Sequence, residues 1–228
     1  VMGEDSPRAL VLSVAVRDWG EDPVALNAAF AADRFAPRPL TDAEIARLGA
    51  AEPLAGAPDH VRADVPEWTV PSLARAFGAD WVAEGEAMTG RPALDLRVNA
   101  LKSSRDRVLK SLARFEPQPA AIAPFGVRLP AGARDDRTPN VQVDEGYIKG
   151  WFEIQDQGSQ IVSAIIGARP GEQVLDYCAG GGGKTLAMAA SMGNHGQIFA
   201  HDSDRTRLAP IYDRLKRNGV RNTQVRPP

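Results

Sequence analysis

The sequence predicts an α/β protein in three parts: a helical N-terminal remnant, a small α+β module, and the first half of a doubly wound parallel sheet. Helix-start signals recur before residue 50, and one alternating strand precedes a capped helix between residues 93 and 115. After residue 170, short apolar runs alternate with helical patterns. These patterns predict domains over residues 1–60, 61–150 and 151–228.

The composition is typical of a soluble globular protein. Of the 228 residues, 43% are hydrophobic and 25% are charged, and the formal net charge is -2. The single cysteine, Cys178, excludes an intrachain disulfide and favours a reducing compartment. The apolar run from Ala9 to Val16 is too short to cross a bilayer. We therefore expect a cytoplasmic protein that does not enter a membrane.

The first sixty residues are expected to form helices followed by a linker. Ser6 can cap a helix that begins at Pro7, and Thr41 and Glu44 have the spacing of a capping box. The segment 50–66 is rich in Pro, Ala and Gly, which is typical of a linker between domains.

Residues 61–150 are expected to form the small α+β module. Leu73, Phe77 and Trp81 recur at helical spacing, and "ALDLRVNAL", residues 93–101, alternates apolar and polar residues as a half-buried strand does. The following "SSRDRVLKSLARF" predicts a capped amphipathic helix, and the segment 130–140 predicts a loop. The apolar stripe of that helix consists of Val108, Leu109 and Leu112.

The last part alternates strands and helices. Strands are predicted over residues 174–177 and 197–201 and from Asn222 onward, and helices over residues 185–192 and 205–218. Strand, helix, strand, helix, strand is the opening of a parallel doubly wound sheet.

The turn after the first of these strands contains four consecutive glycines, in "VLDYCAGGGGKTLAMAA". A phosphate-binding P-loop needs a glycine five residues before the Gly183-Lys184-Thr185 run, and that position holds Cys178. A dinucleotide fingerprint fails as well, because its last glycine would fall on Thr185 or Leu186. The loop therefore predicts a ligand that carries no polyphosphate.

An adenosine ligand fits the rest of the pattern. Asp202 follows the second strand, 19 residues after Gly183, where an acidic side chain can accept hydrogen bonds from ribose hydroxyls. S-adenosylmethionine is the leading candidate. The alternative is a plain tight turn that needs positive φ values, with Asp202 only capping the next helix.

Charge is distributed unevenly. Residues 1–60 carry 5 basic and 10 acidic side chains, whereas residues 91–114 carry 7 basic and 2 acidic ones. The basic window is a candidate RNA-facing surface, and the alternative is a solvated helix face. The three histidines show no metal-ligand spacing, so we predict no metal site.

Four segments together resemble the ribosomal RNA cytosine-C5 methyltransferases of the RsmB (Sun) type, related to the NOL1/NOP2/Sun group. They are "FEIQDQGSQIV", "VLDYCAGGGGKTLAMAA", "IFAHDSDRTRL" and "RLKRNGVRNTQV". "LDLRVNALKSSRDRVLKSL" resembles the RNA-binding module that precedes the catalytic domain in that family, and the helical start is similar to the end of its NusB-like domain. The resemblance implies a Rossmann-like S-adenosylmethionine-dependent methyltransferase acting on small-subunit ribosomal RNA.

The resemblance also implies site residues. Arg97, Asn99 and Lys102 would contact RNA, and Arg207 would support the cofactor pocket or lie on a solvated helix face. The family usually has Ala-Pro where this chain has Gly180 and Gly181. The residues expected to hold the cofactor are Cys178, Ala179, Gly180, Gly181, Gly182, Gly183, Lys184 and Asp202.

Methylation of cytosine C5 requires a thiolate that adds to C6. The family carries this nucleophile in a Pro-Cys motif beyond the third strand, and the sequence stops at Pro228 before such a motif. Cys178 lies in the cofactor loop and is not expected to be catalytic. We therefore expect a monomeric fragment that is inactive alone. The alternative is a noncatalytic RNA-binding protein that keeps the methyltransferase fold.

Overall fold

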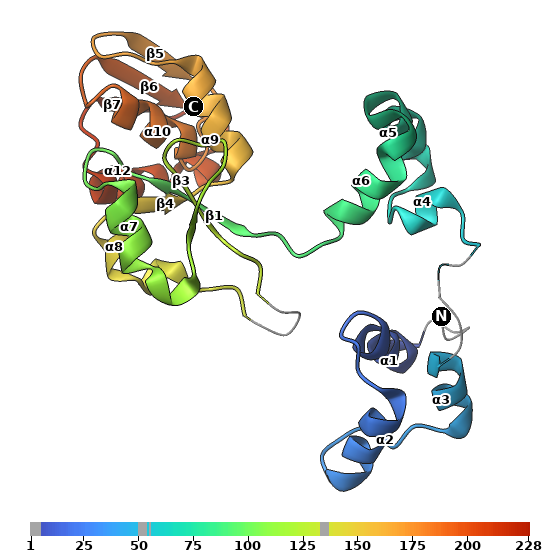
Figure 1. Cartoon of the computed structure of the whole chain (residues 1–228). Helices are drawn as coiled ribbons and strands as arrows, with labels where there is room; N and C mark the ends of the chain where they lie inside the picture. Colours follow the sequence, from blue (N-terminus) through green and yellow to red (C-terminus); the bar gives the residue numbers. More distant parts are fainter. Residues whose placement is uncertain (1–5, 50–53, 55, 133–136) are drawn as a thin grey trace. The chain divides into compact units, whose positions relative to one another are not determined.

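A computed structural model describes residues 6–49, 54, 56–132 and 137–228 (Figure 1). The described residues form two compact units. We call the part up to Arg91 the helical unit and the part from Pro92 onward the α/β unit. The predicted boundaries at residues 60 and 150 do not coincide with this division.

The helical unit begins with three helices whose starts are set by local signals. They are α1 (Pro7–Arg17), α2 (Pro23–Ala32) and α3 (Asp42–Gly49). Ser6 accepts a hydrogen bond from the Ala9 amide, which confirms the predicted cap. The capping box is also confirmed, because the Thr41 amide donates to Glu44 and the Glu44 amide donates to the Thr41 hydroxyl. Their core consists of Ala9, Leu12, Leu40 and Leu48.

The second half of the helical unit departs from the prediction at two places. The segment expected to be a linker contains α4 (Asp59–Arg62), while its residues 50–53 and 55 lie outside the described residues. The helix expected through Leu73, Phe77 and Trp81 is broken into α5 (Val70–Phe77) and α6 (Trp81–Met88). Gly78, with φ 61°, begins the 3-10 turn that separates them.

An antiparallel sheet in the order β2-β3-β1-β4 opens the α/β unit. Its strands are β1 (Leu94–Val98), β2 (Gln118–Pro119), β3 (Gly126–Leu129) and β4 (Phe152–Ile154). Helix α7 (Arg105–Ser111), capped by Ser104 as predicted, packs on it together with the short α8 (Glu145–Ile148). The core consists of Leu96, Val98, Val108, Leu112, Val127, Leu129, Val141 and Phe152.

Strand β4 belongs to this sheet although it follows the predicted domain boundary at residue 150. It pairs with the central strand β1, with Val98 opposite Phe152 and Arg97 opposite Glu153. Without β4, which comes directly before α9 and the parallel sheet, the antiparallel sheet would therefore lack one of its strands. Residues 133–136 of the predicted loop lie outside the described residues.

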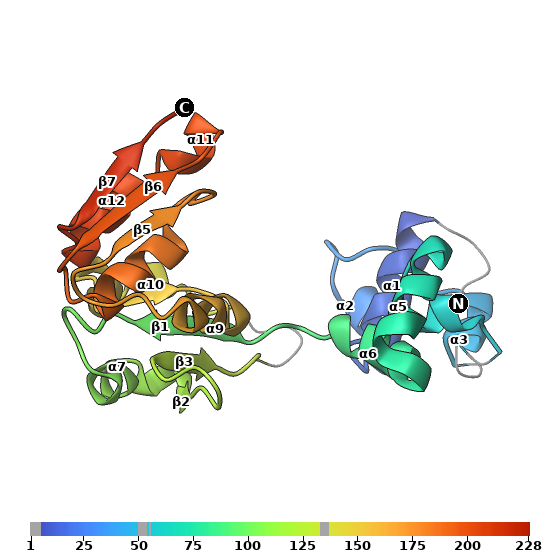
Figure 2. The ribbon, with the colours of Figure 1, turned by 90° about the horizontal axis from the view of Figure 1, so that it is seen from above.

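A parallel sheet in the order β5-β6-β7 follows, and its three strands lie side by side (Figure 2). The elements in chain order are α9 (Gln157–Ile166), β5 (Gln173–Asp176), α10 (Gly183–Ser191), β6 (Gln197–His201), α11 (Arg205–Leu208), α12 (Ile211–Asn218) and β7 (Thr223–Arg226). The predicted mixed α/β fold with a helical start is confirmed. The helix predicted over 205–218 is two helices, because it is interrupted at Ala209 and Pro210 and proline has no amide hydrogen to donate.

The two faces of the parallel sheet differ. Val174, Ile198, Ala200 and Val225 pack against the helices, in clusters that include Met188 of α10 and Ile211 of α12. Leu175, one residue away from Val174 on β5, is 62% exposed. The side chains of a strand alternate between the faces, so the helices cover one face and leave the Leu175 face open.

Among the helices in the described residues, none is long and apolar enough to span a membrane.

The first prediction concerns Glu44. Hydrogen bonds from Arg8 and from the Thr41 amide lower the pKa of Glu44 from 4.5 to about 2. The carboxylate therefore stabilises the folded helical unit above pH 4.5, and this contribution is lost as the pH falls from 4.5 toward 2. Glu44→Gln should cost about 1 kcal/mol at pH 7. Urea unfolding followed by circular dichroism should show the two proteins converging at low pH. A difference that does not change with pH would contradict the assignment.

Candidate cofactor-binding site

The glycine-rich turn joins the carboxyl end of β5 to the start of α10. Strands β5 and β6 are parallel and paired, with Asp176 opposite Ala200, so both strands end at the same edge of the sheet. The Ala179 amide donates to the His201 carbonyl across this edge at 2.9 Å. The turn and the segment that begins at Asp202 therefore lie next to each other, as the sequence predicted.

Two of the four glycines adopt conformations that other residues rarely adopt. Gly180 has φ 49° and Gly182 has φ 80°. A Cβ on Gly182 would lie 2.5 Å from Cγ1 of Ile211, and one on Gly181 would lie 3.0 Å from Nη1 of Arg214. The backbone of the turn thus packs directly on side chains of α12.

Asp202 faces the glycine turn. Its Oδ2 accepts a hydrogen bond from the Gly180 amide at 2.9 Å, and its Oδ1 accepts one from the Asp204 amide at 3.0 Å. These main-chain donors and the nearby Arg207 outweigh the effect of desolvation and lower the pKa of Asp202. The helix cap that was the alternative role belongs to Asp204, which accepts from the Thr206 and Arg207 amides. Asp202 therefore lines the turn as an ionised acceptor.

Two of the remaining predicted loop residues are exposed. They are Cys178 and Lys184, the second of which lies on the first turn of α10. Sequence reasoning missed Thr185, whose hydroxyl donates to Oδ2 of Asp176 at 2.6 Å. This hydrogen bond ties the helix start to the strand end and fixes the width of the turn.

Arg214 of α12 donates a hydrogen bond to the glycine turn, and no sequence motif predicted this contact. Its Nη1 donates to the Gly181 carbonyl at 2.7 Å, and its Nη2 donates to Oε2 of Glu153 at 2.9 Å. One guanidinium therefore connects the glycine turn to strand β4 of the antiparallel sheet. Its planar set of donors permits both contacts at once.

Glu153 is the buried acceptor in this connection, and its role was not predicted from the sequence either. It is 1% exposed, and its carboxylate accepts hydrogen bonds from Arg214, Arg217 and Asn218 of α12. Burial alone would raise the pKa of Glu153, but Arg214, Asn218 and Arg217 outweigh burial and lower the pKa. An acidic residue within a strand between apolar neighbours was the available signal, and it is a weak one.

Asn99 and Lys102, which follow β1 of the antiparallel sheet, also form hydrogen bonds to the end of α12. Nδ2 of Asn99, which is 2% exposed, donates to the carbonyls of Gly150 and Asn218. Nζ of Lys102 donates to the Arg217 carbonyl at 2.6 Å, one of the last carbonyls of α12 that lack a partner within the helix. The burial of Asn99 corrects its expected place on the RNA-facing surface. Lys102 is exposed, and its contact with RNA stays a prediction.

Arg97 likewise lies inside the protein. It is 5% exposed, and its Nε donates to Oε1 of Gln155 at 2.6 Å. The strand was expected to be half-buried, but α9 packs against β1, so both faces of β1 are covered. Arg97 is therefore not available to phosphates on the surface, and a contact of Arg97 with another part of an RNA stays a prediction.

Two family models match parts of the chain. Residues 163–227 match the family model described as 16S rRNA methyltransferase RsmB/F. Residues 65–134 match the ferredoxin-like domain of the same family.

Two curated relatives are named as a probable or established ribosomal RNA small subunit methyltransferase B. The chain is 34% identical over 166 residues to a probable ribosomal RNA small subunit methyltransferase B of Synechocystis, covering 70% of this chain and 35% of that protein. It is 36% identical over 160 residues to the methyltransferase B of an Escherichia coli strain, covering 69% and 36%. The chain therefore spans about a third of the length of these relatives.

Two Pyrococcus horikoshii crystal structures share the fold. A methyltransferase homologue has a TM-score of 0.65 and 26% identity, covering 77% of this chain and 56% of that chain. NSun6 has a TM-score of 0.63 and 17% identity, covering 72% and 65%.

The second prediction concerns the support behind the turn. Arg214→Ala should destabilise the α/β unit by about 3 kcal/mol, because it leaves the buried Glu153 carboxylate with fewer partners and the Gly181 carbonyl without this donor. Chemical denaturation would measure the effect. Lys216→Ala, at an exposed position of the same helix, is the matched control and should change stability by less than about 0.5 kcal/mol. Equal losses in the two variants would refute the role of Arg214.

The third prediction concerns the backbone of the turn. Gly182→Ala should cost about 3 kcal/mol, because the new Cβ meets Ile211 in addition to the strain of a positive φ. Gly171→Ala is the control, since Gly171 has φ 90° and a Cβ added there would meet nothing within 4 Å. It should cost only about 1 to 2 kcal/mol. Thermal unfolding would compare them, and equal Tm values would show that Ile211 does not restrict the turn.

Proposed function

Because the chain belongs to the RsmB/F methyltransferase family, we propose that it binds S-adenosylmethionine in the glycine turn for methylation of cytosine C5 in small-subunit ribosomal RNA. The observation that carries this proposal is the Asp202 carboxylate, which faces the turn and bonds to the Gly180 amide at 2.9 Å. The family match and the small-subunit methyltransferase relatives support it. When bound, the cofactor supplies an electrophilic methyl group on a sulfonium.

The residues of the turn fit this ligand. Gly180 and Gly182 keep side chains out of the space above the strand ends, so main chain can approach the ligand closely. The first-turn amides of α10 lack partners within the helix and favour a carboxylate, as does the ammonium of Lys184. Asp202 stays ionised at neutral pH and can accept from ribose hydroxyls.

The RNA would lie on a basic groove of about 700 Å³ next to α12. Lys102, Lys149, Lys216 and Arg217 line it together with Tyr147. Nζ of Lys149 lies 5.5 Å from the ring centre of Trp151, and the guanidinium of Arg107 lies 3.8 Å from the same ring centre. Cations beside aromatic rings suit the backbone and bases of RNA. This surface includes Lys102, one of the three residues expected to contact RNA.

Methylation of cytosine C5 also requires a thiolate nucleophile that attacks C6. Cys178 is the single cysteine of the sequence and lies in the turn that would hold the cofactor. A residue of the cofactor cradle is poorly placed to attack the far side of a cytosine ring, so we assign Cys178 to binding. In this proposal the chain contributes cofactor and RNA binding, and Cys178 does not supply the attacking thiolate.

The fourth prediction tests the cofactor site. S-adenosylmethionine titrated calorimetrically into the chain should bind, and Asp202→Asn should weaken binding by about 10 to 100-fold, because hydrogen bonds to a charged acceptor are lost. Asp204→Asn is the matched control, since Asp204 caps α11 and its side chain is not bonded to the turn. It should bind nearly as well as the unaltered protein. Undiminished affinity in Asp202→Asn, or no binding by the unaltered chain, would overturn the proposal.

A further inference from the structure

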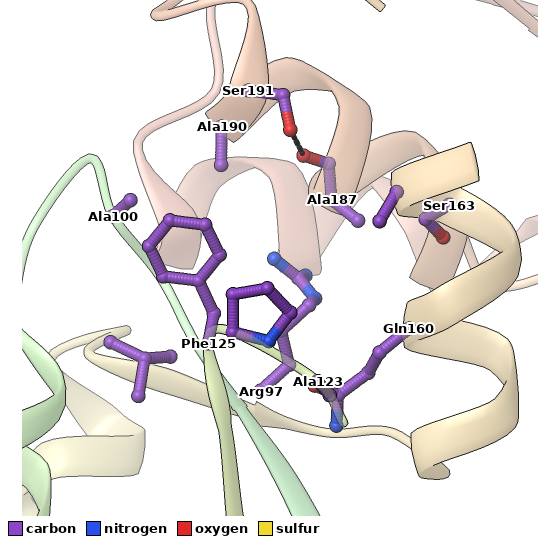
Figure 3. A pocket seen from close by; sticks show the side chains of 12 residues that line it. Arg97, Ala100, Ala123, Phe125, Gln160, Ser163, Ala187, Ala190 and Ser191 are labelled. Carbon is purple, nitrogen blue, oxygen red and sulfur yellow. Dashed lines mark hydrogen bonds between the residues drawn. The ribbon is translucent and has the colours of Figure 1, made fainter. Parts of the chain in front are cut away.

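A pocket separate from the glycine turn lies where the antiparallel sheet meets α9 and α10. It has a volume of about 100 Å³ and opens to solvent. Its walls come from three places: strand β1, the loop before β3, and the facing sides of the two helices (Figure 3). The walls are mostly apolar and consist largely of Ala123, Pro124, Phe125, Ala164, Ala187 and Ala190.

Arg97 places a hydrogen-bond donor in this pocket. Figure 3 shows its guanidinium extending from β1 into the space between Phe125 and Ala187. Nε is held by Gln155 at 2.6 Å, but Nη2 is buried and has no hydrogen-bond partner among the described residues. Burial lowers the pKa of Arg97 to about 10, Glu153 acts against burial, and Arg214 acts with it, so the group is protonated at neutral pH.

Gln160 places an acceptor in the same pocket. Its Nε2 donates to the carbonyls of Leu96 and Gln155, which sets the orientation of the amide. Its Oε1 is buried and, like Nη2 of Arg97, has no partner within the described part of the chain. A buried donor and a buried acceptor without partners each destabilise the folded protein. Both unpartnered atoms belong to residues that line the pocket, so a ligand in the pocket can supply the missing hydrogen-bond partners.

Size and polarity restrict the occupant. An apolar cavity of about 150 Å³ holds one benzene molecule, so this smaller pocket has room for the edge of one six-membered ring, and its opening to solvent leaves space for the rest of the ring. An anion would be attracted by the Arg97 guanidinium, but it would leave the Gln160 oxygen without a donor and would find little polar surface on the other walls. A flat ring with an acceptor beside a donor satisfies both Arg97 and Gln160. Cytosine and uracil have this arrangement along their pairing edges.

We propose that the pocket between β1, α9 and α10 binds a single pyrimidine base, with Arg97 donating to a ring acceptor and Gln160 accepting from the adjacent donor. This inference rests on the proposed RNA substrate and adds to it a base-reading site whose lining residues do not include those of the cofactor turn. Phe125, which is half exposed at the pocket, supplies a stacking surface. The base comes from a single-stranded stretch of RNA or from a free nucleoside.

Alanine methyl groups provide a direct test on the unaltered chain. Alanine-methyl NMR should show shifts at Ala123, Ala164, Ala187 and Ala190 when oligocytidylate or oligouridylate RNA is added, and smaller shifts with oligoadenylate. The methyl groups of Ala9 and Ala15 in the helical unit should not move. Cytidine and uridine, added alone, distinguish the two sources. Shifts with the nucleosides but not with the oligomers support the pocket and assign it to a free ligand.

Ala190→Leu is designed to fill the pocket without removing a charge. It should weaken the binding of a labelled pyrimidine oligomer about tenfold in fluorescence anisotropy. Ala113→Leu, at an exposed position away from the pocket, should leave binding unchanged. Pyrimidine RNA that binds without shifting the pocket alanines overturns the inference, and so does equal response to oligoadenylate or no response to any probe. The S-adenosylmethionine titration is independent of these outcomes, so the pocket can fail while the proposed function stands.

Discussion

The α/β unit depends on the ion-pair cluster around Glu153. This buried carboxylate lies on β4 of the antiparallel sheet, and its partners Arg214, Arg217 and Asn218 lie on α12 of the parallel-sheet half. Charges taken out of water need such partners, because a buried carboxylate without them is strongly destabilising. The cluster therefore favours one arrangement of the two sheets over alternatives in which these charges would not meet. Asn99 and Lys102 add hydrogen bonds to the same helix end.

The Glu153 cluster is also connected to the glycine turn that is proposed to bind the cofactor. Arg214 bonds to Glu153 and to the Gly181 carbonyl, so the group that joins the two sheets also holds the glycine turn. On the opposite side of the turn, Asp202 fixes the Gly180 amide. A turn with four glycines would otherwise have much conformational freedom to lose on binding a ligand. Contacts on both sides remove part of that freedom before the ligand arrives.

Local features could be predicted from the sequence, and long-range ones could not. The Ser6 cap, the Thr41–Glu44 box and the strand at 197–201 depend on neighbours a few residues away, and all three are present as predicted. The Asp202 position followed from the order of parallel strands. Arg97 and Asn99 were misplaced because their partners, Gln155 and Asn218, are 58 and 119 residues away. Nothing in a strand's own alternation shows which later helix will cover its polar face.

The backbone at Gly150 has a practical consequence. A Cβ there would lie 2.1 Å from the Arg217 carbonyl oxygen, so the segment between the two folds is pressed against the end of α12. Although residue 150 looks from the sequence like a place to divide the protein, a polypeptide ending there would lose strand β4, and one starting there would lose the sheet that β4 joins. A piece that keeps both sheets together with the Glu153 cluster starts at Pro92, where the α/β unit begins.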